Sequence, residues 1–184
     1  AHNHLSNLTS FSSICEFLFC YFVVQFVPIL SQNKGKLMLS DSSKKLPKIL
    51  TAKVVAKSRL FEIQSVDLEF SNGELRTYER FKPGNQQAVM MVPIDVDDLL
   101  LIREYSVGTE RYELGFPKGG VDKDEEPKDA ANRELKEELG LGANKIDFLR
   151  TVITNPSYMR SVMHIFVAQE FYPCQLEGDE PEPL

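Results

Sequence analysis

The stretch from Gly119 to Leu141 constrains this chain more than any other part of its sequence. Pro127 suits the first turn of a helix, and Gly140 suits the residue that follows the last turn. On this helix the glutamates at positions 134, 137 and 138 are spaced i, i+3 and i+4, so their side chains lie on one face. The segment therefore predicts a helix that crowds three carboxylates together directly after one arginine, Arg133.

Two explanations fit this acidic face. Solvent, Arg133 and Lys136 would be enough to screen the carboxylates of an ordinary surface helix. Alternatively, divalent cations hold the carboxylates, since hard oxygen ligands suit Mg²⁺ and Mn²⁺, which also bind phosphate oxygens. The spacing of the glutamates alone does not decide between a solvated face and a metal site.

Most of the remaining chain has the pattern of β-structure. Before residue 84, β-branched and aromatic residues nearly alternate with polar ones, and two later apolar runs, 88–94 and 99–105, predict strands buried on both faces. The predicted strands are 49–58, 60–70, 75–83, 88–94, 99–105, 145–154 and 161–171. Turns are expected at 71–73, 96–98 and 155–157, and residues 82–87 are expected to form a linker.

The composition limits the classes of partner. The chain has 184 residues and a formal net charge of −6, so no basic face for nucleic acid is evident, and an anionic substrate would need local arginines or metal ions. The three cysteines form no CxxC pair and the three histidines have no ligand spacing, which argues against a disulfide framework and a zinc site. This cysteine usage favours a reducing, cytoplasmic location. His164 is expected to be an ordinary strand side chain.

The first forty residues have a different character. Residues 11–30 are mostly apolar and about long enough to span a bilayer, but Glu16, Gln25 and Pro28 interrupt them. Three readings stay open: sequence foreign to the working protein, a membrane anchor, or a partner-binding or misassigned segment. We expect residues 1–37 to be dispensable and the working protein to start near Met38, so a membrane association is not favoured.

The wider pattern around the glutamates carries a resemblance to a known family. The register G-x5-E-x7-R-E-U-x-E-E-x-G-U, where U is a bulky aliphatic residue, is filled at every fixed position from Gly119 to Leu141. This register is the Nudix box, and from about residue 46 to 184 the chain resembles the Nudix hydrolases that act on ADP-linked compounds. The resemblance implies an α/β fold, namely an α/β/α sandwich with a mixed sheet, preceded by a small antiparallel β-segment.

The same resemblance implies a division of the chain and a possible assembly. It predicts a non-core segment 1–45, an N-terminal β-segment 46–83 and a Nudix domain 84–184. Because a Nudix fold normally continues with another strand and a helix, we expect the domain to be truncated at its C-terminal end. Relatives that cleave ADP-ribose are dimers in which the N-terminal strands help to build the partner's site, so a homodimer is expected.

The resemblance also assigns roles to the box. It implies that Glu134 and Glu138 are the main ligands of Mg²⁺ or Mn²⁺, that Glu137 assists or orients water, and that the backbone carbonyl of Lys118 is a further ligand. Arg133 resembles the arginine that orients the box glutamates, by pairing with Glu125. The plainer alternative is an ion pair between Arg133 and Glu125 that only fixes the loop.

Residues outside the box are assigned less firmly. A late acidic loop carries the catalytic base or a further ligand in relatives, which makes Glu180 the first candidate and Glu182 the second, against the alternative of a solvated acidic tail. Arg80 and Arg103 are candidates for substrate phosphate, because guanidinium suits phosphate bidentately, although each would equally suit a surface ion pair. Glu113 is a weaker candidate for adenine or ribose, since relatives carry their glutamate where this chain has Gly115.

The implied activity is hydrolysis of ADP linked to another group, with ADP-ribose, NADH and diadenosine triphosphate as substrates and AMP as one product. The alternative is a catalytically silent Nudix-type module that binds an adenine nucleotide. Silent versions typically lose box glutamates, and none is missing here. The sequence does not rank the three substrates.

Overall fold

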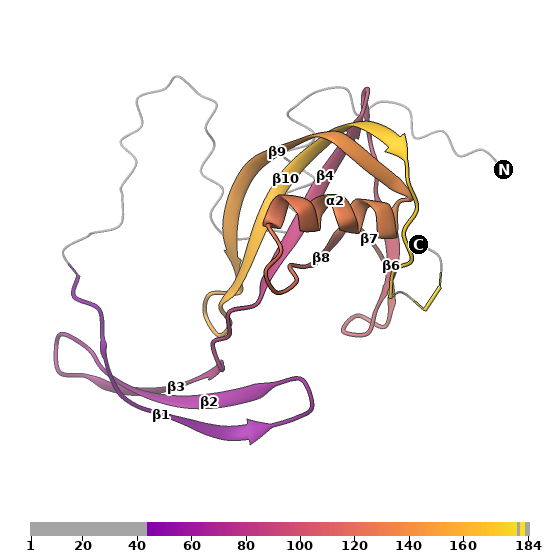
Figure 1. Cartoon of the computed structure of the whole chain (residues 1–184). Coiled ribbons are helices and arrows are strands. Elements are labelled where there is room, and N and C mark those ends of the chain that lie inside the picture. Colours follow the sequence, from indigo (N-terminus) through magenta and orange to yellow (C-terminus); the bar gives the residue numbers. More distant parts are fainter. Residues whose placement is uncertain (1–43, 180, 183–184) are drawn as a thin grey trace. The chain divides into compact units, whose positions relative to one another are not determined.

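The computed structural model describes residues 44–179, 181 and 182 (Figure 1). The expectations about the apolar segment 11–30 and about Glu180 lie outside these residues. The fold below is that of the unit formed by residues 45–184. Within the described part of the chain, no helix is both long enough and apolar enough to cross a bilayer.

An antiparallel sheet of three strands comes first, in the order β1-β2-β3 (Figure 1). Its strands are β1 (Lys48–Lys57), β2 (Glu62–Glu69) and β3 (Leu75–Phe81). The predicted hairpin turn between β2 and β3 is confirmed, because Gly73 has a φ of +84° and its amide donates to the carbonyl of Phe70 over 2.9 Å. The antiparallel N-terminal β-segment is therefore present as expected.

A mixed sheet forms the core of the remaining chain. It contains β5 (Asp98–Leu99), β4 (Gln87–Asp95), β10 (Ser161–Pro173) and β9 (Leu141–Thr154) in this order, and β8 (Lys118–Gly120) also pairs with β4. Strands β4 and β10 are parallel, whereas the other pairs are antiparallel. The middle of β4 is buried throughout, as its apolar run predicts. His164 lies in β10 as expected. Its Nδ1 lies 2.9 Å from the hydroxyl of Thr151 on β9, and its Nε2 lies 2.6 Å from Oε1 of Gln87 on β4.

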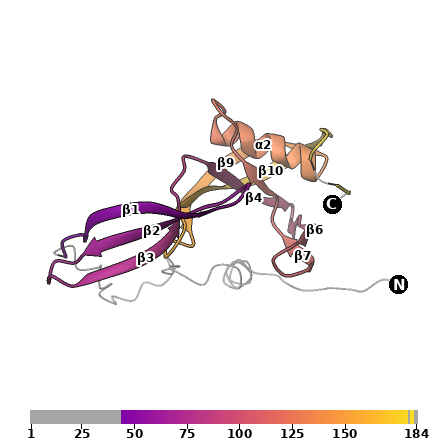
Figure 2. The same cartoon turned by 90° about the horizontal axis from the view of Figure 1, so that it is seen from below.

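One helix, α2 (Pro127–Glu138), packs against this sheet (Figure 2). Ala130, Ala131 and Leu135 are fully buried and pack against Met91 of β4 and Phe166 of β10. The predicted boundaries are confirmed, since Pro127 is at the start and Gly140, just beyond the end, has a φ of +68°. The helix and the mixed sheet match the predicted Nudix fold, while no described residue belongs to a second helical layer.

The predicted strand 99–105 is wrong in two respects. The strand that pairs with β4 ends at Leu99: the amide of Leu100 still donates to the carbonyl of Pro93 over 3.1 Å, but Pro93 has no amide hydrogen to return the bond. It then forms β6 (Ile102–Ser106), which pairs with β7 (Arg111–Gly115) in a separate hairpin. Only Ile102 of β6 is buried, so this strand is not covered on both faces.

Candidate active site

Helix α2 delivers the three predicted glutamates to one face. Glu134 and Glu138 are each only 8% exposed, although both are charged residues. Glu137, between them in sequence, is partly exposed. Charged side chains are rarely buried unless they are paired, so this face must contain groups that offset the carboxylates.

Arg133 is the first of these groups. Its guanidinium donates to Glu125 from Nε and Nη2 over 3.0 and 3.1 Å, to Glu134 and Glu137 from Nη1 over 2.7 and 2.9 Å, and to the carbonyl of Gly120 from Nη2 over 2.8 Å. These hydrogen bonds raise the pKa of Arg133, with Glu125 as the largest cause. They also lower the pKa of Glu125, whose carboxylate accepts a further bond from the amide of Asp122.

Strand β8 provides the second group. The amide of Lys118 donates to Oε2 of Glu138 over 2.9 Å. The strand itself is held on β4 at both ends, by the bond from the Met91 amide to the Pro117 carbonyl and by the bond from the Val121 amide to the Gln87 carbonyl, each 2.9 Å long. These bonds fix the segment before the helix against the sheet. The backbone amide of Lys118 is thereby held where it donates to the buried carboxylate of Glu138.

Gly119, the next residue of β8, lies against Glu134. A Cβ atom at this position would be 2.0 Å from the carboxyl carbon of Glu134, well inside any allowed contact. The glycine of the box is thus required because a carboxylate approaches its backbone closely, and a positive φ is not the reason.

The donor set fits a hard divalent cation. Three carboxylates on one helix face and the backbone carbonyls of β8 are the oxygen ligands that Mg²⁺ and Mn²⁺ prefer. The carboxylates are turned towards Arg133 and the amide of Lys118, and no three acidic, histidine or cysteine side chains among the described residues converge on a common point. An ionised carboxylate has about four acceptor sites, so a cation can share these groups with Arg133 and the amide of Lys118.

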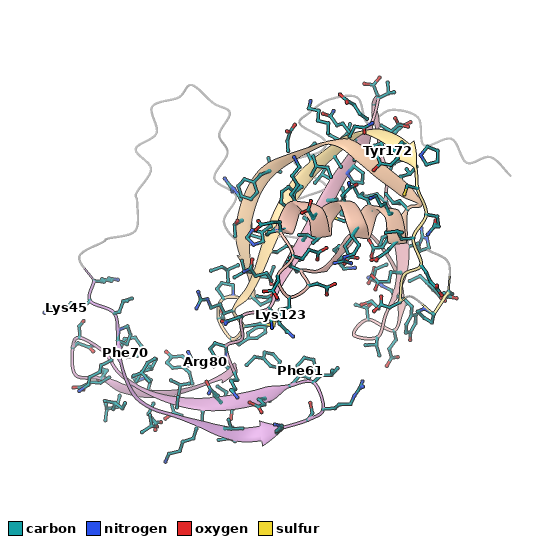
Figure 3. The ribbon with its side chains drawn as sticks, viewed as in Figure 1. Lys45, Phe61, Phe70, Arg80, Lys123 and Tyr172 are labelled. Atoms are coloured by element: carbon teal, nitrogen blue, oxygen red, sulfur yellow. The ribbon has the colours of Figure 1, made fainter. Side chains whose placement is uncertain are left out.

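The substrate candidates outside the box are dispersed over other elements. Arg80 lies on β3 of the first sheet (Figure 3), where its Nε donates to Oε1 of Gln64 over 3.3 Å. It lines a cavity of about 390 Å³ together with residues of the β9–β10 turn. Arg103 is exposed on β6. Glu113 on β7 pairs with Arg111 over 2.8 Å. No described contact joins these three residues to the box.

The late acidic loop is attached to two elements that flank the site. Of its two candidates Glu182 is described, and its Oε1 accepts a hydrogen bond from the hydroxyl of Tyr112 on β7. At the start of the loop, the side chain of Gln175 donates to the carbonyl of Glu137 over 3.1 Å, and the amide of Leu176 donates to the carbonyl of Lys136 over 3.1 Å. Sequence reasoning missed these caps on the last turn of α2, because a glutamine after a strand carries no signal for them.

Sequence reasoning also missed the side chain of Lys118. Its ammonium pairs with Oε2 of Glu104 on β6. The resemblance assigns a role only to the carbonyl of this residue, and the partner of its ammonium lies 14 positions earlier in the sequence. Figure 3 shows the loop from β8 to α2, in which Lys123 is labelled.

Comparisons with known proteins agree with this architecture. The model of the NUDIX domain matches residues 84–183, and that of the NudE-type Nudix hydrolase N-terminal domain matches residues 47–80. The chain therefore belongs to the Nudix hydrolase family, whose members are generally dependent on a divalent metal.

Among its relatives is the ADP compounds hydrolase NudE of Escherichia coli (strain K12), which is 62% identical over 138 residues, or 75% of this chain and 74% of the relative. The ADP-ribose pyrophosphatase of Bacillus subtilis (strain 168) is 31% identical over 128 residues, or 67% of this chain and 69% of the relative. A crystal structure of an ADP compounds hydrolase superposes with a TM-score of 0.74 at 60% identity, covering 77% of this chain and 76% of that one.

Proposed function

We propose that this chain is a pyrophosphohydrolase that cleaves the diphosphate of ADP-containing compounds, such as ADP-ribose, NADH and diadenosine triphosphate, into AMP and the other half. The observation that carries the proposal is the complete box, whose buried glutamates are held by Arg133 and by the amide of Lys118. The substrate class is supported by relatives named as hydrolases of ADP compounds and of ADP-ribose.

Glu134 and Glu138, with Glu137 and the carbonyl of Lys118, are the proposed ligands of Mg²⁺ or Mn²⁺. When bound, such a cation polarises phosphate oxygens and lowers the pKa of a coordinated water. Arg133 holds Glu134 and Glu137 in place through one nitrogen, Nη1, and so acts on the reaction by positioning these carboxylates.

The remaining roles concern the catalytic base and the substrate contacts. Glu180 is the first choice for the base and lies outside the described residues, and Glu182 is the second. The hydrogen bond from Tyr112 gives the Glu182 carboxylate a fixed partner on β7, which suits a positioned group better than a solvated tail. Arg80 on β3, Arg103 on β6 and Glu113 on β7 remain candidates for substrate contacts. All three lie outside the box.

A homodimer in the cytoplasm is the proposed state of the protein. Strand β1 is exposed along its whole length, and its apolar side chains Ile49, Leu50, Val54 and Val55 are 43–54% exposed. Such a row of apolar residues on an edge strand suits a second copy of the chain. Light scattering coupled to gel filtration should give twice the chain mass of 20.9 kDa, and a mass of one chain would contradict the dimer.

Product analysis tests the proposed activity. The chain is incubated with Mg²⁺ and, separately, with ADP-ribose, NADH and diadenosine triphosphate, and the products are separated by chromatography. AMP is expected from each compound, and the relative rates rank the three substrates. Binding of these compounds without release of AMP would contradict the hydrolase and favour a silent binding module.

A further inference from the structure

The guanidinium of Arg133 has no donor left for a substrate. An arginine has five N–H donors. In this structure its Nε, Nη1 and Nη2 donate five hydrogen bonds, to three glutamates and to the carbonyl of Gly120. Besides a bound metal ion, a phosphate placed at the box would therefore meet carboxylates and a saturated arginine, so a cationic side chain that contacts it has to come from another residue.

Lys118 is placed to supply this cation. Its amide donates to Glu138, so the residue is already part of the wall of the site. Side chains alternate along a strand, and the neighbouring Gly119 faces Glu134, so the side chain of Lys118 extends from the opposite face of β8. There its ammonium pairs with Glu104, and both side chains remain 46% exposed.

The ion pair between Lys118 and Glu104 is of the kind that exchanges easily. Pairs with this degree of exposure contribute little to stability, because water competes for both charges. The flexible stem of a lysine also lets its ammonium turn from one oxygen ligand to another without a movement of the backbone.

Glu104 has a second charged neighbour. In the register of the β6–β7 hairpin it lies directly opposite Glu113, and like charges in this position repel one another. Arg111 offsets the charge of Glu113 over 2.8 Å, and Lys118 offsets that of Glu104. The carboxylate of Glu104 therefore competes with any other anion for the ammonium of Lys118.

We propose that the Lys118 ammonium is a substrate-binding group, which leaves Glu104 and binds a phosphate oxygen when an ADP-containing compound enters the site. This inference rests on the proposed function. Glu104 binds the ammonium of Lys118 before the substrate arrives, and it competes with the substrate phosphate for this ammonium. The two side chains of one ion pair are thus assigned opposite effects on substrate affinity.

Steady-state kinetics with ADP-ribose and Mg²⁺ tests this assignment on Lys118→Gln, Glu104→Gln and the double variant. Lys118→Gln should raise KM about tenfold with kcat nearly unchanged, because a charged hydrogen bond to the substrate is lost. Glu104→Gln should lower KM by about twofold to fivefold, because its competition is removed. The double variant should behave like Lys118→Gln.

Lys145→Gln is the matched control, since Lys145 also forms a surface ion pair, with Asp147 over 3.8 Å, and its replacement changes the net charge equally. It should leave KM unchanged. A purely structural ion pair between Lys118 and Glu104 would move KM in the same direction in both single variants, and this result, or an unchanged KM in Lys118→Gln, would overturn the inference while the hydrolase stands.

A binding measurement separates this inference from the activity itself. Calorimetric titration of ADP-ribose in the presence of EDTA excludes turnover, and Lys118→Gln should weaken the binding about tenfold. This loss would support the role of Lys118 even if the wild type released no AMP. Equal binding by the wild type and Lys118→Gln, or no binding by either, would overturn it. Thermal unfolding of each variant checks that the fold is kept.

Discussion

The carboxylate of Glu134 lies in the space that a side chain on Gly119 would need, with its carboxyl carbon 2.0 Å from the position of a Cβ atom. Glu134 cannot move aside freely, because it is only 8% exposed and Nη1 of Arg133 holds it over 2.7 Å. Strand β8 cannot retreat either, since it is paired with β4. A glycine and a glutamate that are 15 positions apart in the sequence are therefore fitted to each other.

Gly119→Ala should reduce kcat/KM for ADP-ribose by roughly 10–100-fold, because the methyl group displaces a proposed metal ligand. Gly120→Ala is the matched control, since nothing lies within 4 Å of its Cβ position and its φ is not positive. Its activity should stay near that of the wild type. Equal losses in the two variants would show that the loop, and not the contact with Glu134, is sensitive to a side chain.

Glu125→Gln should lower the free energy of unfolding by about 1–2 kcal/mol at neutral pH, because Arg133 loses a charged partner. Hydrogen bonds from Arg133, and then from the amide of Asp122, hold the pKa of Glu125 below its ordinary value of 4.5. A lowered pKa stabilises the fold above pH 4.5, and this contribution is lost as the pH falls through the folded-state pKa.

Urea unfolding of the wild type and Glu125→Gln across a pH series measures this linkage. The difference between the two free energies of unfolding should be largest above pH 4.5 and should shrink towards acid. A difference that grows on acidification would contradict the assigned direction of the pKa shift.

Arg133→Lys tests whether the network positions the box carboxylates. A lysine keeps the charge but has three donors on one nitrogen, so it cannot hold Glu125, Glu134 and Glu137 together as the guanidinium does. We expect kcat to fall roughly 10–100-fold and the Mn²⁺ concentration for half-maximal activity to rise. Arg76→Lys, at an exposed arginine paired with Glu74 over 2.8 Å, should change neither quantity.

The local elements of the fold could be predicted because short-range signals determine them. The turn at 71–73 follows from Asn-Gly, the ends of α2 follow from Pro127 and Gly140, and the buried strand β4 follows from its apolar run. The fit of the box glutamates to one helix face is likewise a matter of spacing, and the pairing of Arg133 with Glu125 agrees with the expectation that the resemblance gave.

What the sequence did not reveal depends on contacts between distant segments. The Lys-Gly-Gly sequence of β8 has no strand propensity, and it is a strand because β4 offers it a pairing edge. β7 lies outside the strands that the sequence predicts, and it forms because it pairs with β6 in a hairpin separate from the mixed sheet. Both contacts of Lys118, with Glu138 and Glu104, follow from these placements and therefore have no signature in the sequence.

The C-terminal end of α2 offers a test of stability alone. Gly140 has a φ of +68°, and a Cβ there would lie 2.5 Å from Oε1 of Gln175. Nε2 of the same glutamine side chain donates to the carbonyl of Glu137. Gly73, with a φ of +84° and nothing within 4 Å, is the matched position without a contact. Gly73→Ala should cost about 1–2 kcal/mol from the backbone alone.

Gly140→Ala should cost at least about 1 kcal/mol more than Gly73→Ala, because the cap from Gln175 is lost as well. Urea unfolding of both variants measures the two costs. Equal costs would mean that Gln175 contributes nothing to the end of the helix.

The most direct test of the central claim is kcat/KM for ADP-ribose with Mg²⁺ in the wild type, Glu138→Gln and Glu126→Gln. Glu138 is a buried box carboxylate, whereas Glu126 is exposed at the start of the same helix and its side chain makes no capping bond. The account predicts a loss of roughly 100-fold or more for Glu138→Gln and near wild-type activity for Glu126→Gln. Full activity in Glu138→Gln would contradict it, because hydrolysis would then not depend on the carboxylates of the box.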